Sequence, residues 1–188
     1  MRRALVAFLL GGLALAAPAA RSTDYRIASA SSHAAFAVRL LWLRTISGRF
    51  TQIAGEVRLD PRHRATIDAH ISVDSIAMDS EHFRRWILAP EFFDAAHYPT
   101  IRFLSDPIPL AMLTSGGVLD GQLSLRGITR AVRFELLPAT CTTVTTPTCL
   151  IEARGLVSRS AFGMTSHRAV LSDQVQLGLS IALDPASN

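Results

Sequence analysis

The stretch VQLGLSIAL at residues 175–183 alternates large apolar side chains with small or polar ones. A period of two is typical of a β-strand with one buried face, because successive side chains of a strand point to opposite sides. Such alternation in many consecutive strands predicts an antiparallel sheet, folded as a sandwich or a closed barrel. With residues 24–28 as a short additional strand, the other alternating segments are residues 36–38, 56–60, 67–74, 101–103, 122–126, 132–136 and 151–155.

The dipeptide Arg126-Gly127 lies between two of the alternating segments. A connection this short with a glycine is typical of a tight β-turn. It therefore predicts a hairpin between residues 118–126 and 129–137.

One segment breaks the alternation. Between residues 79 and 96, Phe83 and Ile87 follow helical spacing, Ser80 is placed to cap a short helix, and Pro90 is placed to end it. This helical insertion plugs one end of a barrel, forms the lip of a pocket, or does both.

The first nineteen residues have the layout of a secretory signal peptide. Arg2 and Arg3 precede an apolar run at residues 4–16, and Ala17-Pro18-Ala19 supplies the small residues of a cleavage site. We expect residues 1–19 to be removed and residues 20–188 to form one periplasmic or secreted domain without a stable membrane span. A retained N-terminal anchor is the alternative, but no second apolar run follows to fix a topology.

The charged residues give little indication of an anionic partner. Every basic residue is arginine, and removal of Arg2 and Arg3 lowers the formal net charge from +4 to +2, because 17 basic residues then face 15 acidic ones. The arginines are scattered along the chain and do not form a basic stripe with interleaved aromatic residues. This pattern argues against nucleic-acid binding.

Two cysteines, Cys141 and Cys149, flank a segment rich in threonine. In an exported protein they favour a disulfide that closes this short loop. A metal pair is the competing interpretation, although no histidine or third cysteine lies near them in the sequence. No metal or cofactor is expected.

Several motifs, in a fixed order, resemble those of the YceI family. The segment PEFFD at residues 90–94, followed by YPTIRF at 98–103, is similar to the family's central signature. The accompanying motifs are HAAFAV at residues 33–38, SGRF at 47–50, VDSI at 73–76, GQLSLRGITR at 121–130, RSAFGM at 159–164 and SDQV at 172–175. The resemblance implies an all-β, eight-stranded antiparallel, lipocalin-like barrel with a short inserted helix. It also implies a periplasmic or secreted protein, since members of the family are typically exported, and some of them bind a polyisoprenoid chain inside the barrel.

The chain departs from the family pattern at polar positions. Leu40 stands where the family usually has a histidine, and FRRWI at residues 83–87 stands where the family has an aspartate and a histidine. We therefore expect a different or more apolar ligand head group.

These observations favour an exported binding or carrier protein that holds a polyisoprenoid, an isoprenoid quinone or a similar lipid. Small residues on inward faces, namely Ala69, Ala153 and Gly155, favour a cavity. For each expected lining residue, plain core packing is an equally open interpretation. The residues expected to line the ligand site are Phe36, Val38, Trp42, Phe50, Trp86, Phe92, Phe93, Ile101, Phe103, Leu123, Leu125, Phe134, Phe162 and Met164.

Catalysis is a second hypothesis, with weaker support. The six histidines are dispersed, and none belongs to a nucleophile or zinc motif. His33 and His97 lie near the starts of expected strands, where they could meet a polar ligand.

A filled barrel that acts through its surface is the third hypothesis. Arg159 and Asp173 flank a loop and are expected to form a structural ion pair that closes the barrel, with ligand contact as the alternative role. The sequence leaves open whether two copies pair as a homodimer.

Overall fold

A computed structural model describes residues 24–139, 141, 144 and 149–185 of the 188-residue chain. The expected signal peptide at residues 1–19 lies outside this range. The described part contains thirteen strands, all paired antiparallel, and few helices. The strands are β1 (Asp24–Ile27), β2 (His33–Leu40), β3 (Arg44–Phe50), β4 (Ile53–Leu59), β5 (Arg64–Ser72), β6 (Ile76–Ala77), β7 (Thr100–Ser105), β8 (Ile108–Pro109), β9 (Gly117–Leu125), β10 (Ile128–Leu136), β11 (Ile151–Ser158), β12 (Leu171–Ile181) and β13 (Leu183–Pro185). The helices are α1 (Glu81–Leu88) and α2 (Met112–Ser115), with 3₁₀ turns η1 (Ser29–Ser31), η2 (Val73–Ser75) and η3 (Arg159–Phe162).

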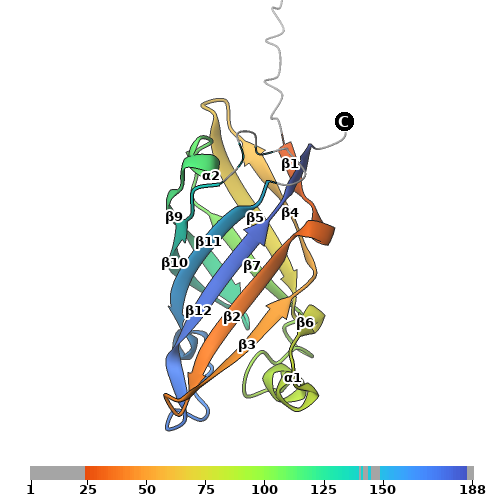
Figure 1. Cartoon of the computed structure of the whole chain (residues 1–188), viewed down its shortest axis with the longest axis vertical. Coiled ribbons are helices and arrows are strands. Elements are labelled where there is room, and N and C mark those ends of the chain that lie inside the picture. The colour runs from red at the N-terminus through yellow and green to blue at the C-terminus, as the bar shows by residue number, and fades with distance from the viewer. Residues whose placement is uncertain (1–23, 140, 142–143, 145–148, 186–188) are drawn as a thin grey trace, which may run out of the picture.

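The sheet curls into a barrel. Pairing leads from β1 through β4, β5, β7, β9, β10 and β11 to β12, and β12 also pairs with β2. One residue after β12, strand β13 begins and pairs with β1, so the path returns to its starting strand (Figure 1). The interior of the barrel is therefore enclosed by side chains that alternate inward along the strands.

The expected number of eight strands is corrected to thirteen, because interruptions divide several segments. A 3₁₀ turn separates β1 from β2, another separates β5 from β6, and single Ala182 separates β12 from β13. At the first interruption Ser32 replaces part of the ladder: its hydroxyl donates to the Ala28 carbonyl at 2.7 Å and accepts from Ala182 N at 3.1 Å. Short breaks of this kind carry no signal in a period-two pattern.

The expected hairpin is confirmed between β9 and β10. Nine residue pairs join the two strands, from Ile128 opposite Leu125 to Leu136 opposite Gly117. Arg126 and Gly127 both have positive φ, 53° and 71°. Two successive left-handed residues match the right-handed twist of paired strands.

The expected short helix is also present. Its first turn is capped by the Ser80 hydroxyl, which accepts a hydrogen bond from Phe83 N at 3.4 Å. The helix ends at Leu88, two residues before Pro90. Figure 1 shows α1 at the same end of the barrel as the β2–β3 hairpin and the segment that leads into β12. This end is called the mouth below.

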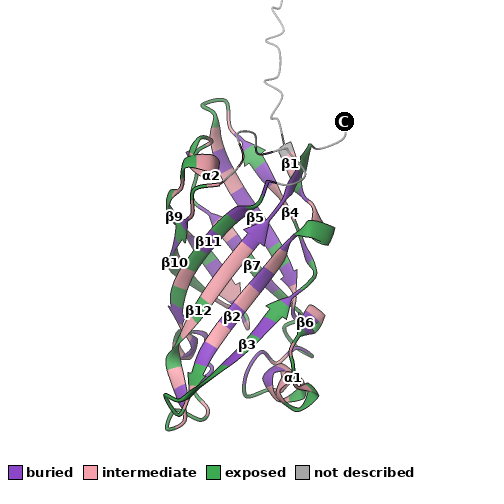
Figure 2. Cartoon of the chain, viewed as in Figure 1, coloured by how far each residue is buried: buried purple, intermediate pink, exposed green. Residues whose placement is uncertain are grey.

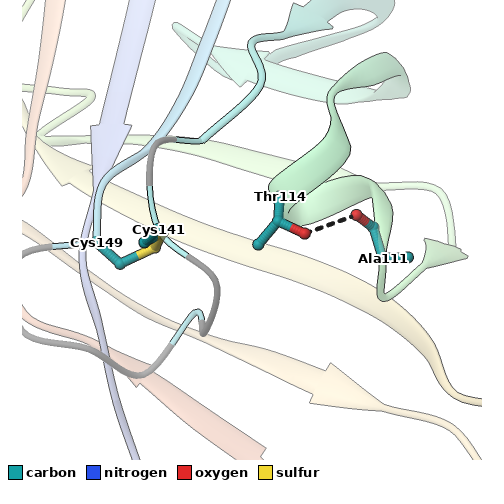
Figure 3. The surroundings of a disulfide bond; sticks show 4 residues. All are labelled: Ala111, Thr114, Cys141 and Cys149. Atoms are coloured by element: carbon teal, nitrogen blue, oxygen red, sulfur yellow. Dashed lines mark hydrogen bonds between the residues drawn. A yellow bond between two sulfur atoms is a disulfide. The ribbon is translucent and has the colours of Figure 1, made fainter.

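Helix α2 lies at the opposite end of the barrel (Figure 1). Leu113 of α2 is fully buried, and most inward strand positions around the barrel are buried (Figure 2). Cys141 and Cys149 are joined in a disulfide with 5.4 Å between their Cα atoms, within the usual range, and lie near α2 (Figure 3). Ala139 N also donates to the Thr114 carbonyl of α2 at 2.8 Å, which fastens the neighbouring strand end.

Candidate functional site

An apolar cavity of about 110 Å³ lies inside the barrel. Its walls come from β2, β3, β5, β7, β9, β10, β11 and β12, and from α1 and η3 with the loop that follows each of them. Among the described residues that line it, Arg159 alone carries a charge, and the others are hydrocarbon, aromatic, methionine or glycine.

The structure places twelve of the fourteen expected residues around this cavity. They lie on strands from both halves of the barrel and on the segment around α1. These lining residues are Phe36, Val38, Phe50, Trp86, Phe92, Phe93, Ile101, Phe103, Leu123, Leu125, Phe134 and Met164.

Two expected lining residues lie elsewhere. Trp42 is at the tip of the β2–β3 hairpin with 77% of its surface exposed, because the turn projects beyond the sheet. Phe162 belongs to η3 and is fully buried in the main core, where it packs without forming part of the cavity wall. The RSAFGM motif at residues 159–164 did not indicate whether Phe162 packs in the core or lines the cavity.

Several wall residues were missed. Ile46 of β3 lines the cavity, as do Val175, Leu177 and Leu179 of β12. The β12 residues share the inward face of the alternating stretch, so the signal was present. Ile46 alternates with Gly48 and Phe50, but this segment was interpreted only as a family motif.

Small inward residues contribute less space than expected. A Cβ at Gly155 would lie 2.7 Å from Cδ1 of Phe134, its partner across the strand pair, so the aromatic ring already occupies that space. Ala69 is buried but is not part of the wall. Of these three residues, Ala153 lines the cavity.

Aromatic side chains close the cavity at the mouth. Trp86 and Phe92, both lining residues, have ring centroids 4.5 Å apart. His167, from the loop before β12, stacks on Phe92 at 5.9 Å and also contacts Trp86 at 5.1 Å. Deeper in the barrel, Phe93 packs edge-on against Phe50 at 5.5 Å. The helical insertion therefore contributes several aromatic residues to the cavity wall.

Arg159 is buried, and backbone carbonyls accept hydrogen bonds from all three nitrogens of its guanidinium group. Its Nε donates to the Ser172 carbonyl at 3.0 Å, and its Nη1 donates to the Met164 and Ser166 carbonyls, both at 2.7 Å. Its Nη2 donates to the Leu171 carbonyl at 3.3 Å. Burial lowers the pKa of the guanidinium from its ordinary value. This side chain therefore ties the loop before β12 to η3.

The expected ion pair between Arg159 and Asp173 is corrected in its geometry: the two charges attract each other, but not through direct contact. Within the described part of the chain the two groups make no direct salt bridge, because the arginine is committed to carbonyls. Asp173 instead accepts hydrogen bonds from the Ser158 hydroxyl and from Ser160 N, the latter at 3.0 Å. The Ser158 hydrogen bond is the largest cause of a lowered pKa for the Asp173 carboxyl.

The histidines singled out in the sequence lie away from the cavity. His97 is exposed, with its Nδ1 2.8 Å from Asp94 Oδ1. His33, at the start of β2, is half-buried, and this burial lowers its pKa. No group of three or more potential metal ligands occurs among residues 24–139, 141, 144 and 149–185.

No helix in the described ranges is long and apolar enough to cross a membrane.

Comparison with known proteins places the chain in a family. The YceI-like domain model matches residues 25–183. A UPF0312 protein of Vibrio vulnificus is 33% identical over 139 residues, covering 70% of this chain and 71% of the relative. A UPF0312 protein of Vibrio cholerae is 32% identical over 138 residues, covering 70% and 71% respectively.

Solved structures share the fold. BcnA of Burkholderia cenocepacia is similar with a TM-score of 0.70 and 19% identity, over 82% of this chain and 98% of that one. A polyisoprenoid binding domain from Saccharophagus degradans is similar with a TM-score of 0.64 and 12% identity, over 87% of this chain and 99% of that one. The family match runs from β1 to β13, so the chain belongs to the YceI-like domain family.

Proposed function

We propose that this protein is an exported carrier that holds the apolar chain of a polyisoprenoid, an isoprenoid quinone or a similar lipid inside its barrel. The observation that carries the proposal is the composition of the cavity wall. Apart from Arg159, whose nitrogens are engaged by carbonyls, every described lining residue has an uncharged and largely apolar side chain. Such a wall favours hydrocarbon over any polar molecule.

The size of the cavity limits how much of a chain it receives. A volume of about 110 Å³ is comparable to an engineered cavity of ~150 Å³ that binds benzene. One five-carbon unit fits this space, and a longer chain extends through the mouth, displacing the rings of Trp86 and Phe92. Burial contributes about 0.8 kcal/mol per methylene group, opposed by the cost of ordering the chain.

The wall also supports binding over catalysis. Within the described residues, the lining set includes no hydroxyl, thiol, carboxylate or imidazole side chain. General acid–base and nucleophilic chemistry need such groups within hydrogen-bonding distance of the substrate. The polyisoprenoid binding domain from Saccharophagus degradans, which has the same fold, supports the choice of an isoprenoid chain as ligand.

Native mass spectrometry tests the proposal. The protein is purified without detergent from a host that exports it, weighed intact, and then extracted with organic solvent. We expect one apolar molecule per chain. We also expect the polypeptide mass of residues 20–188, because the signal peptide at residues 1–19 is proposed to be removed. A clean protein mass, with no uptake of added geranylgeraniol or ubiquinone, would overturn the carrier function and favour a filled barrel that acts through its surface.

A further inference from the structure

Three consecutive large apolar residues are exposed at the mouth. Leu41, Trp42 and Leu43 form the tip of the β2–β3 hairpin, with 53%, 77% and 93% of their surfaces exposed. Large exposed apolar residues that lie together usually mark an interaction site in a soluble protein. We call these three residues the apolar tip.

The backbone of the apolar tip is unfavourable for the residues that it contains. Leu41 and Trp42 have positive φ, 50° and 61°. Tight hairpin turns with this conformation usually contain asparagine, aspartate or glycine, since larger side chains are strained there. Leu41 N is held by the Val170 carbonyl at 2.7 Å, and Leu43 N by the Leu40 carbonyl at 3.2 Å. Neither stability nor solubility explains a leucine and a tryptophan at these positions.

Exposed arginines surround the apolar tip. Arg39 and Arg44 flank it on β2 and β3, and Arg168 belongs to the loop whose Val170 is hydrogen-bonded to Leu41. The guanidinium of Arg44 lies 5.9 Å from the centroid of the Phe83 ring. In the described part of the chain, none of these three arginines has an acidic side chain within salt-bridge distance.

Two acidic residues on neighbouring elements have partners of their own. Glu81 of α1 lies 3.8 Å from Arg84. Asp173 accepts its hydrogen bonds from Ser158 and Ser160. The arginines at the tip are therefore available to an external anion.

We propose that the apolar tip and Arg39, Arg44 and Arg168 dock the barrel, mouth first, onto the surface of an anionic phospholipid bilayer. Tryptophan is favoured at the membrane interface, where its ring is partly in hydrocarbon and partly in contact with polar groups. Leucine side chains enter the acyl boundary, and arginines beside them attract lipid phosphates. Charge complementarity favours this surface over a neutral one.

Docking would place the mouth of the barrel at the membrane. Trp86, Phe92 and His167 cover the cavity at the same end as the apolar tip. If the proposed carrier function holds, this is the position in which a lipid chain passes between bilayer and barrel. Docking itself requires no ligand in the cavity, so the two proposals are tested separately.

Vesicle flotation measures the docking. The probes are vesicles of phosphatidylcholine alone and of equal parts phosphatidylcholine and phosphatidylglycerol, both free of isoprenoid lipids. We expect the protein to float with the anionic vesicles and to be released by salt, because screening weakens exposed charge interactions. A Trp86→Phe variant, in which Trp42 is the remaining tryptophan, should show a blue shift of fluorescence with anionic vesicles.

Two variants assign the binding to the tip. Leu41→Ser/Trp42→Ser/Leu43→Ser should lower affinity for anionic vesicles by about tenfold or more, since it removes the inserted surface. Arg39→Gln/Arg168→Gln should remove most of the preference for anionic lipid. Leu156→Ser is the matched control, since Leu156 is 60% exposed on β11, outside the tip. Circular dichroism establishes that each variant is folded.

The following outcomes would overturn the docking proposal. One is wild-type flotation by the triple serine variant; another is the absence of vesicle binding by the wild-type protein. If the wild-type protein instead forms a dimer that the triple variant does not form, the tip binds a second copy of the chain. Vesicle binding by a protein that has no extractable lipid and takes up neither geranylgeraniol nor ubiquinone would reject the carrier function and leave docking supported. A lipid-loaded protein that does not bind vesicles would reject docking and leave the carrier function supported.

Discussion

The exposed imidazole of His167 stacks on the buried ring of Phe92, with 5.9 Å between ring centroids and 7° between ring planes. The two residues come from distant segments of the chain, and only Phe92 lines the cavity. His167 is thus the outer layer of the aromatic cover at the mouth. Its backbone carbonyl also accepts hydrogen bonds from Val170 N at 3.1 Å and Leu171 N at 2.9 Å, which hold the loop in place.

Replacing His167 with alanine should accelerate ligand exchange. An aromatic pair contributes about 0.5–1.5 kcal/mol beyond its buried area, so its loss should raise association and dissociation rates by about two- to tenfold. Stopped-flow fluorescence with a conjugated polyene fatty acid measures both rates. His63→Ala is the control, because His63 is exposed and has a similar positive φ of 56° in the β4–β5 turn. Equal acceleration by both variants would contradict a covering role.

Enlarging Ala153 should weaken ligand binding without unfolding the barrel. Ala153 is buried and lines the cavity, so an Ala153→Leu side chain enters space that a ligand would use. We expect at least a tenfold loss of affinity, or about 1.4 kcal/mol, and an unchanged or higher melting temperature because a cavity is filled. Titration of an isoprenoid alcohol, followed by intrinsic fluorescence, measures the affinity.

The matched control for this substitution is Ala131→Leu. Ala131 is exposed on the outer side of β10. The same enlargement there should leave affinity unchanged. Equal affinity of the Ala153→Leu variant and the wild-type protein would show that ligand does not use this part of the cavity.

The period-two pattern predicted the sheet well, because the inward face of each strand is set by burial. It identified β12, the two strands of the β9–β10 hairpin and part of the cavity wall. It did not predict the breaks in the strands, since these depend on single hydrogen bonds such as that between the Ser32 hydroxyl and Ala182 N. A periodic pattern reports which face is buried, not where a ladder is interrupted.

The functional site was harder to predict, for two physical reasons. Whether an inward residue lines space or fills it depends on its cross-strand neighbour, as with Gly155 under the Phe134 ring. Loops are placed by contacts from distant parts of the chain, so nothing in the sequence placed His167 over Phe92. Trp42 was expected to line the ligand site, but the turn carries its side chain outward.

Protonation of Asp68 should destabilise the barrel at low pH. Both Asp68 oxygens accept from Arg102, at 2.8 and 2.7 Å, and these hydrogen bonds lower the pKa of the Asp68 carboxyl. The contribution is therefore present above the unfolded pKa of about 3.9 and is lost as the pH falls through the lower folded pKa. Asp68→Asn should cost about 1–2 kcal/mol at neutral pH and progressively less in acid.

Urea unfolding at neutral pH and below the unfolded pKa measures this difference. Asp106→Asn serves as the control, because Asp106 is exposed in the loop after β7. A cost of Asp68→Asn that does not change with pH would show that packing, not ionisation, makes this residue important.

Replacing Arg159 with lysine should destabilise the protein strongly despite keeping a positive charge. The guanidinium reaches four carbonyl oxygens from one buried position, and an ammonium with three donors on a flexible stem cannot reproduce that fork. With carbonyls left unpaired, we expect the free energy of unfolding to fall by about 3 kcal/mol or more, measured by chemical denaturation.

Asp173→Asn is the informative comparison. In a direct ion pair the two substitutions would cost similar amounts, whereas here Asp173 is exposed and an asparagine oxygen still accepts from Ser160 N. Asp173→Asn should therefore lower the free energy of unfolding clearly less than Arg159→Lys. Equal losses would indicate that the two side chains form a direct ion pair.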